Sequence, residues 1–228
     1  MDWTDKMETR PQILIADDHI IFADGLRLLL EKRYAVVGSV TDGRALVTES
    51  CRLKPDVIVI DVGMPFLNGL DAARRVREQL PKVKLVFLTM QDNPNLAAAA
   101  LELGSAGFVL KHSAGSELVK AIEQVLHGKC YVTSKLRPED WVVQKTRARQ
   151  YSSHLTPRQR DIVQMFAEGR PIKEIAGHLN LSEKTIEFHK YHIMETFNLK
   201  NNADLVLFAL KQGLISLDSG PVQAQKSS

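Results

Sequence analysis

The amino-acid sequence predicts an α/β domain followed by an all-α domain. Up to about residue 127, short apolar runs alternate with longer segments of helical spacing, which specifies a parallel sheet with helices on both faces. From Leu155 to Ile215 every segment has the spacing of a helix. A stretch rich in Pro, Ser, Lys and Arg separates the two parts, and a chain of 228 residues is long enough to bury a core in each.

Five strand–helix pairs make up the first part. The apolar runs that predict strands cover residues 13–16, 35–40, 57–60, 84–89 and 107–111. Helices are expected at residues 20–32, 43–53, 69–80, 95–104 and 116–128, with Ser116 as the N-cap of the last. The run VIVI at 57–60 is apolar throughout, which indicates a strand that is buried on both faces. We therefore expect a doubly wound (βα)5 sheet.

The second part contains four helical segments, which include IKEIAGHLN and SEKTIEFHKYHIMETFN. The domain boundaries follow from these patterns: a flexible tail at 1–11, the α/β domain at 12–128, a linker at 129–152, the helical domain at 153–216 and a disordered tail at 217–228. The linker is basic and contains one possible short helix at 138–149.

The composition limits the classes of protein to which this chain can belong. The chain is 44% apolar and 25% charged with a net charge of +3, as in ordinary soluble globular proteins. Two cysteines, Cys51 and Cys130, fit neither a disulfide framework nor a metal site, which favours a reducing compartment. The first residues lack the features of a signal peptide, and no apolar run approaches the roughly 20 residues that span a bilayer. We expect a cytoplasmic protein without a membrane partner.

Polar side chains follow four of the five predicted strands. Asp17 and Asp18 come after the first strand, Asp61 after the third, Thr89 ends the fourth and Lys111 ends the fifth. Because ligands of open parallel sheets bind at the carboxyl ends of the strands, we expect these groups to share one site. Clustered carboxylates favour a hard cation, and Mg²⁺ is the ion that prefers a few carboxylates together with phosphate oxygens.

This set of groups suits phosphoryl transfer. Lys and Thr can hold phosphoryl oxygens, and a carboxylate such as Asp61 can act as the nucleophile. The alternative is that Asp17 and Asp18 merely cap the next helix while Asp61 opens a turn. His19 stands beside the acids and is either a further ligand or a capping or packing residue.

The motifs ILIADDH, VIVIDVGMPFLNGL, VFLT and GSAGFVLK resemble the receiver domain of bacterial two-component response regulators, over roughly residues 11–128. The resemblance implies a flavodoxin-like fold with Asp61 as the phosphoacceptor. It implies that Mg²⁺ is bound by Asp17, Asp18, Asp61 and the backbone carbonyl of Gly63. It further implies that Thr89 and Lys111 bind the phosphoryl group and that Phe108 is the aromatic switch residue.

Two departures from the receiver pattern have consequences. His112 stands where many receivers have a proline in a cis bond, and a non-proline cis bond costs about 2.5–4 kcal/mol, so we expect a trans bond. The positions two beyond Asp61 and Thr89 are Gly63 and Gln91, and neither is an acid. Because nothing there activates water strongly, we expect a long-lived aspartyl-phosphate.

The segment PIKEIAGHLNLSEKTIEFHKYHI has the anatomy of a helix-turn-helix. Asn180 can adopt the left-handed conformation of the turn, and Ser182 can cap the second helix. Aromatic residues among lysines on an outward face suit a DNA major groove. The residues expected to contact DNA are Lys173, Lys184, Thr185, Glu187, Phe188, Lys190 and Tyr191.

Residues 155–215 resemble the LuxR-type helix-turn-helix domain, and with the receiver this indicates the NarL/FixJ family of response regulators. The resemblance implies a transcription regulator that a sensor histidine kinase phosphorylates and that binds double-stranded DNA, as a homodimer when phosphorylated. It does not imply an enzyme. The last helix supplies either part of the dimer contact or only core, through Leu205, Val206, Phe208 and Ala209.

Two other classes of function stay open at this point. One is an enzyme on the same scaffold, a phosphatase or a flavin-binding redox protein, although Gly63 replaces the acid that a phosphatase needs and ADDHI would repel a flavin phosphate. The other is a protein-binding module whose helix-turn-helix does not read DNA. The acidic Glu187 and the low charge of the helical domain keep that alternative open. Gly177 within a helix and Arg170 at a capping position are departures from the LuxR-type pattern.

Overall fold

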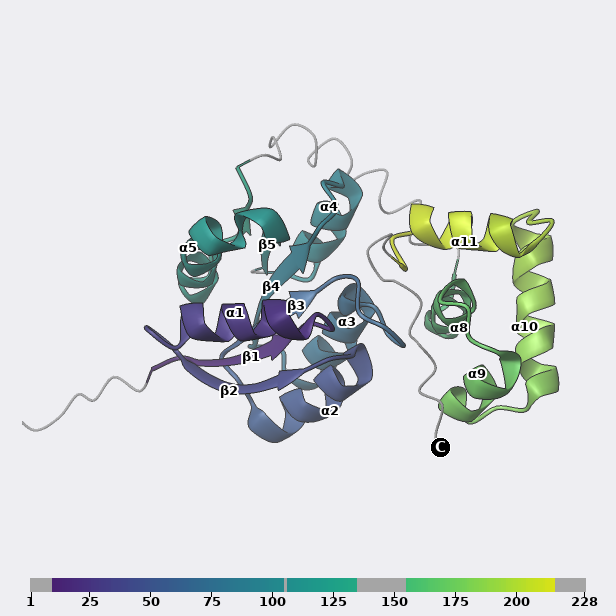
Figure 1. Ribbon diagram of the computed structural model, residues 1–228, viewed down its shortest axis with the longest axis horizontal. Helices are drawn as coiled ribbons and strands as arrows, with labels where there is room; N and C mark the ends of the chain where they lie inside the picture. Colours follow the sequence, from purple (N-terminus) through teal and green to yellow (C-terminus); the bar gives the residue numbers. More distant parts are fainter. Residues whose placement is uncertain (1–9, 105, 135–154, 216–228) are drawn as a thin grey trace, which may run out of the picture.

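The computed structural model describes residues 10–104, 106–134 and 155–215, and these form two domains that lie side by side (Figure 1). The α/β domain precedes the helical domain in the chain, as the sequence predicts. The tails predicted at 1–11 and 217–228, apart from residues 10 and 11, and the possible helix at 138–149 lie outside the described residues.

The α/β domain contains one parallel sheet with the strand order β2-β1-β3-β4-β5-β6. Its strands are β1 (Gln12–Ala16), β2 (Ala35–Val40), β3 (Val57–Asp61), β4 (Lys84–Thr89), β5 (Ala106–Leu110) and β6 (Tyr131–Val132). Its α-helices are α1 (Ile20–Leu30), α2 (Gly43–Leu53), α3 (Gly69–Gln79), α4 (Pro94–Glu102) and α5 (Ala114–Leu126), and a single 3₁₀ turn, η1 (Lys111–Ser113), precedes α5.

Both faces of this sheet are covered by helices. Alternate residues of β1 face opposite ways: Ile13 and Ile15 pack with α1 and α5, whereas Leu14 and Ala16 pack with α2, α3 and α4. Neighbouring β3 follows the same rule, which explains why the run at 57–60 contains no polar residue. Each strand is thereby fixed in direction and register.

The structure differs from the sequence expectations at two points of the α/β domain. Residues predicted to begin the linker form β6, which pairs with β5 at the sheet edge. The last helix begins at Ala114 rather than at residue 116, so Ser113 is its N-cap and Ser116 lies within its first turn. The bond before His112 is trans, since no cis peptide occurs within the described ranges.

The helical domain consists of α8 (Pro157–Ala167), α9 (Ile172–Leu179), α10 (Glu183–Thr196) and α11 (Asn202–Lys211). Local sequence explains their ends. Thr156 and Gln159 form a capping box at the start of α8, and the side chain of Ser182 accepts a hydrogen bond from the backbone N–H of Thr185. Asn180 is left-handed with φ 52°, as the turn between α9 and α10 requires.

A compact apolar core joins these four helices. Leu205 and Ala209 are fully buried in it, and Phe208 packs against it with its ring centroid 4.7 Å from that of Phe197. Of the two alternatives for the last helix, these three residues therefore belong to the core. Leu207 is instead a large apolar residue of α11 that is exposed.

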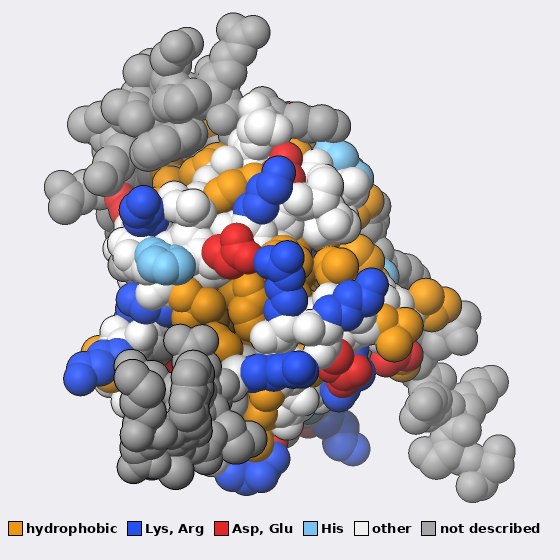
Figure 2. Space-filling model, turned by 90° about the vertical axis from the view of Figure 1, so that its left-hand side faces the viewer, with side chains coloured by type: hydrophobic (Ala, Val, Ile, Leu, Met, Phe, Trp, Pro, Cys, Tyr) orange, Lys and Arg blue, Asp and Glu red, His pale blue; other side chains and the backbone are white. Residues whose placement is uncertain are grey.

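Figure 2 shows the face of the α/β domain that lies opposite the helical domain. Basic and apolar side chains are intermingled on this face, with fewer acidic ones among them. None of the described helices combines the length and the hydrophobicity needed to cross a membrane.

Candidate functional site

The carboxyl ends of the central strands bring the predicted acids and lysine together. The Lys111 ammonium donates to Asp61 Oδ2 at 2.8 Å and to Asp17 Oδ1 at 3.1 Å. These three side chains come from positions 44 or more residues apart in the chain, and all are at least 93% buried. The sequence-predicted residues Asp17, Asp61 and Lys111 therefore form a buried cluster of charged groups in contact.

The electrostatics of the cluster are those of a crowded carboxylate pair around one cation. Burial raises the pKa of Asp61 to about 6, with Lys111 opposing this and Asp17 adding to it. Burial alone would lower the pKa of Lys111, but its attraction to Asp61 and Asp17 raises that pKa above its usual value. Asp61 thus carries a desolvated charge that a further cation would stabilise.

Close backbone packing holds Asp61, the candidate nucleophile, in place. A Cβ on Gly69 would lie 2.1 Å from the carbonyl oxygen of Asp61, so only glycine lets the start of α3 approach this strand end. The backbone N–H of Gly63 donates to Asp61 Oδ1 at 3.1 Å. On the next strand, Thr89 Oγ1 is buried and accepts from the N–H of Gln91 at 3.0 Å.

The acidic residues fit a divalent cation. One ligand atom from each of Asp17, Asp18, His19 and Asp61 lies within 4.8 Å of the others. Asp18 Oδ1 is buried and accepts no hydrogen bond from the described residues, while His19 Nδ1 lies 2.9 Å from it. Two lone pairs at that distance repel each other unless a proton or a cation lies between them. The oxygen-rich donor set suits a hard ion.

His19 also takes part in the hydrogen bonding of the pocket. Its backbone N–H donates to Asp17 Oδ1 at 2.9 Å, and its ring Nδ1 lies 3.4 Å from the Lys111 ammonium. The residue stands at the N-cap position of α1 without a side-chain cap hydrogen bond. Of the alternatives left open by the sequence, contact with the acidic cluster agrees with the geometry, and capping by the side chain does not.

The proposed switch residue Phe108 is fully buried in β5, within the core beneath α2, α3 and α4. Its ring is therefore already inside the domain in this structure. An inward swing of that ring, which the resemblance would suggest, has no exposed starting position here.

The outward face of α10 agrees only in part with the DNA contacts predicted from sequence. Phe188 and Tyr191 are 66% and 70% exposed, and the Phe188 ring stacks on that of His192 at a centroid distance of 6.3 Å. Lys184 and Glu187 on the same helix are exposed as well, as is Lys173 on α9. An exposed aromatic pair flanked by a lysine thus exists on this helix.

Two of the predicted DNA contacts are engaged within the protein. The Lys190 ammonium lies 4.7 Å from the centroid of the Phe166 ring on α8, a cation–π contact that turns it away from the outer face. The Thr185 hydroxyl lies 2.8 Å from that of Ser182 at the helix start. Sequence spacing places a residue on a face but does not decide where a long side chain points.

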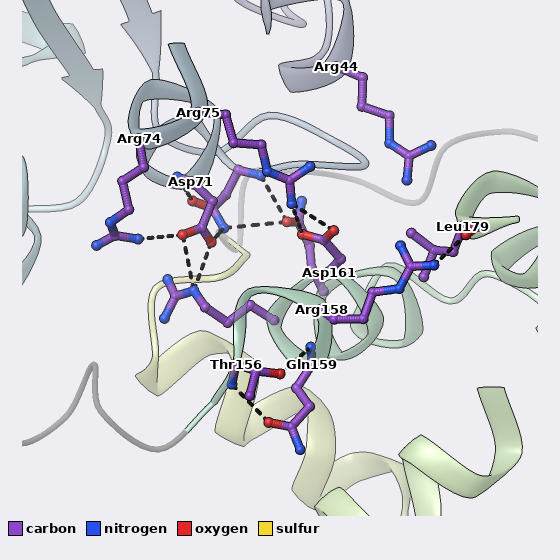
Figure 3. A network of polar contacts seen from close by, with 12 residues as sticks. Arg44, Asp71, Arg74, Arg75, Thr156, Arg158, Gln159, Asp161 and Leu179 are labelled. Carbon is purple, nitrogen blue, oxygen red and sulfur yellow. Dashed lines mark hydrogen bonds and ion pairs between the residues drawn. The ribbon is translucent and has the colours of Figure 1, made fainter. Parts of the chain in front are cut away.

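Sequence reasoning missed a polar contact between the two domains. Arg160 on α8 pairs with Asp71 on α3. Arg75 on α3 and Asp161 on α8 also pair, and their side chains point toward each other (Figure 3). One signal was present: Arg170 occupies a position that a small capping residue would suit better. In the structure its guanidinium lies 3.8 Å from the centroid of the Phe66 ring in the other domain.

Family comparisons match both domains. Residues 13–123 match the response regulator receiver domain, and residues 153–209 match the bacterial regulatory proteins of the luxR family. The transcriptional regulatory protein MctR of Rhizobium johnstonii is 32% identical over 214 residues, which cover 92% of this chain and 99% of that protein. The oxygen regulatory protein NreC of Staphylococcus epidermidis is 34% identical over 215 residues, 90% and 99% of the two chains.

A solved structure is similar over both domains. RcsB from Salmonella enterica serovar Typhimurium, bound to promoter P1flhDC in the presence of the phosphomimetic BeF3⁻, is 28% identical with a TM-score of 0.59. The match covers 87% of this chain and 98% of that one. The chain therefore belongs to the NarL/FixJ family of response regulators and is a transcriptional regulator in which a receiver domain precedes a LuxR-type helix-turn-helix domain.

Proposed function

We propose that Asp61 accepts a phosphoryl group from a sensor histidine kinase and that this modification controls DNA binding by the helical domain. The observation that carries the proposal is the Lys111 ammonium, which bonds two buried carboxylates at the sheet edge. Such an arrangement stabilises negative charge that develops at the site during transfer.

Each residue of the pocket has a role in this proposal. Asp17, Asp18, Asp61 and the backbone carbonyl of Gly63 would hold Mg²⁺, which would neutralise charge on the phosphoryl oxygens. The Lys111 ammonium and the Thr89 hydroxyl hold the remaining oxygens. Their burial excludes bulk water, and neither Gly63 nor Gln91 offers an acid to activate a water molecule. The resulting aspartyl-phosphate is therefore long-lived, and its decay in the isolated protein takes longer than seconds.

The second half of the proposal concerns DNA. The exposed Phe188 and Tyr191 touch base edges or thymine methyl groups in the major groove, while Lys184 and Lys173 neutralise phosphate. Basic and acidic residues nearly balance in the helical domain, so one copy binds weakly and two copies on a two-fold site bind firmly. A likeness to RcsB on promoter DNA with a phosphomimetic supports this, as does the helix-turn-helix geometry. A DNA target and a kinase donor place the activity in the cytoplasm.

The test compares Asp61→Asn with a matched control, Asp56→Asn. Asp56 precedes the same strand at its opposite end, where its carboxylate accepts a hydrogen bond from Gln12. Wild type and Asp56→Asn are expected to gain one phosphoryl group from a small-molecule phosphodonor with Mg²⁺, seen by intact mass, and to bind duplex DNA more tightly. Asp61→Asn is expected to do neither. Equal labelling of Asp61→Asn would remove this residue from the mechanism.

Salt dependence separates DNA binding from the protein-binding alternative, which Glu187 on the exposed face of α10 keeps open. Phosphate contacts release counterions, so retention on duplex DNA falls steeply as salt rises. If the phosphorylated protein fails to bind DNA at low salt, the helix-turn-helix serves a protein partner instead.

A further inference from the structure

The ring of His19 faces the acidic pocket. Its Nδ1 lies 2.9 Å from Asp18 Oδ1, 3.3 Å from Asp17 Oδ1 and 3.9 Å from Asp61 Oδ2. These are the three carboxylates that the proposed function assigns to the metal ion. An imidazole nitrogen therefore lies among the oxygen ligands of that site.

The spacing of these atoms is that of ligands around one ion. Two ligands at right angles on an octahedral ion, each about 2.1 Å from it, are about 3 Å apart, and two on opposite sides are about 4.2 Å apart. The distances from His19 Nδ1 to Asp18 and Asp17 are close to the first value, and its distance to Asp61 approaches the second. The nitrogen thus has the position of a ligand as well as the chemistry of one.

The oxygens around the ring have unused capacity for a cation. Asp17 is 1% exposed, and no group of the described residues donates a hydrogen bond to its Oδ2, although the Lys111 ammonium lies 2.9 Å away. Asp18 Oδ1 is also buried and has no hydrogen bond within the described part of the chain. A buried carboxylate oxygen without a donor costs free energy, and a bound cation would remove that cost.

The surroundings of the ring leave Nδ1 available to an ion. The Lys111 ammonium, which can only donate, lies 3.4 Å from Nδ1, so a lone pair on that nitrogen is favoured. His19 stands at the N-cap of α1 without a side-chain cap hydrogen bond, and no backbone N–H of the helix competes for the ring. The side chain is 45% exposed, which gives an ion a path from solvent.

A nitrogen ligand changes which ions a site prefers. Mg²⁺ takes oxygen ligands and keeps several waters, so an imidazole adds little to its binding. First-row transition ions bind imidazole more readily, and Mn²⁺ also accepts carboxylate and carbonyl oxygens. A site with oxygen and nitrogen ligands therefore discriminates between the two classes of ion.

We propose that His19 Nδ1 is a ligand of the metal ion in this pocket, where it replaces a water molecule and makes the site bind a first-row transition ion such as Mn²⁺ in preference to Mg²⁺. The inference rests on the proposed function, because it concerns the ion beside Asp61. Mg²⁺ supports phosphorylation through the oxygen ligands alone. His19 selects the ion that the pocket holds most tightly.

Electron spin echo modulation of bound Mn²⁺ tests the nitrogen ligand directly. The full-length protein is loaded with Mn²⁺ alone, once with natural histidine and once with ¹⁵N-labelled histidine. We expect ¹⁴N modulation from a bound imidazole in the first sample and its replacement by the ¹⁵N pattern in the second. His19→Ala should lose the modulation. His127→Ala is the matched control, because His127 is exposed at the end of α5 that lies far from the pocket, and it should keep the modulation.

Calorimetric titration of the same proteins measures the selectivity. The ratio of Mn²⁺ affinity to Mg²⁺ affinity is expected to fall about tenfold or more in His19→Ala, since even the outer-shell partners of a metal ligand are worth about that much. Mg²⁺ affinity should change little, because its ligands are oxygens. His127→Ala should match wild type with both ions.

The outcomes separate this inference from the proposed function. Bound Mn²⁺ without histidine modulation would overturn the role of His19, as would modulation that survives in His19→Ala or an equal loss of affinity for both ions. The proposed function is checked separately by labelling of the wild type with phosphoramidate and Mg²⁺, followed by intact mass. Histidine modulation without labelling would overturn that function instead. Circular dichroism checks the fold of His19→Ala, and the ¹⁵N comparison in wild type decides the question even if that variant does not fold.

Discussion

The acidic pocket and the outer face of α10 differ in how firmly the protein holds their side chains. In the pocket Asp17, Asp61 and Lys111 are 1%, 4% and 7% exposed, and each lies within hydrogen-bonding distance of another charged group. On α10, Phe188 and Tyr191 are about two-thirds exposed. A reacting site must be organised before its substrate arrives, whereas a DNA-reading face can be organised by the DNA.

The largest effect expected from this comparison follows the removal of the positive charge of Lys111 from the pocket. Lys111→Met keeps the apolar stem and removes the ammonium that bonds Asp61 and Asp17. With no cation to stabilise the transferring group, the rate of phosphorylation by a small-molecule donor is expected to fall about 100-fold or more. Intact mass spectrometry over time measures it, with Lys120→Met on α5 as a control. A rate within threefold of wild type would mean that the pocket is less organised than its hydrogen bonds indicate.

A second prediction concerns the desolvation of Asp61. Its pKa is raised from 3.8 to about 6, so the folded chain binds this proton more tightly than the unfolded chain. The contribution of Asp61 to stability is therefore fully present below the unfolded pKa and is lost as the pH rises through about 6. Asp61→Asn carries no such charge. In EDTA at about pH 8 its free energy of unfolding is expected to exceed that of wild type by up to about 3 kcal/mol.

Urea denaturation at several pH values measures this difference, which should shrink as the pH falls toward the unfolded pKa of Asp61. Mg²⁺ should reduce it at high pH by stabilising the wild-type carboxylate cluster. A gap between the two proteins that does not change with pH would show that Asp61 is well solvated.

The smallest effect is expected on α10 and compares two lysines of the same helix. Lys184 is exposed, whereas the Lys190 ammonium lies over the Phe166 ring. Lys184→Ala should weaken DNA binding severalfold and reduce the slope of log affinity against log salt by about 0.9 for each DNA phosphate that is no longer neutralised. Lys190→Ala should change the slope less. Fluorescence anisotropy across a salt series gives both slopes, and equal changes would mean that Lys190 swings outward on DNA.

Much of the fold was predictable because the apolar runs and the positions of the charged residues indicate the same strands and helices. The strand at 35–40, the helix at 43–53 and the strand at 84–89 have the predicted bounds, and the other helices of the α/β domain differ from prediction by one to a few residues at their ends. The start of the last of these helices was misplaced because either Ser113 or Ser116 suits a cap. The sixth strand was missed because two residues carry no pattern of their own and pair only where β5 presents an edge.

The candidate pocket was predictable for a related reason. In a parallel sheet, all carboxyl ends lie at one edge, so residues far apart in sequence meet there by topology alone. No such rule governs the contact between domains, which involves Asp71, Arg160, Arg170 and Phe66. Each is ordinary in its own helix or loop, and its role depends on how two folded bodies dock.

By itself the sequence determined the two domain types, the order of their elements and the meeting of Asp17, Asp61 and Lys111, because these follow from local periodicity and from the geometry of parallel strands. Only the tertiary structure decided that Lys190 turns inward, that Phe108 is already buried and that Gly213 and Ile215 line the pocket. Those features depend on which surfaces of the folded elements pack against one another. The packing is determined by the shape and charge of several elements at once, so no single segment of the sequence encodes it.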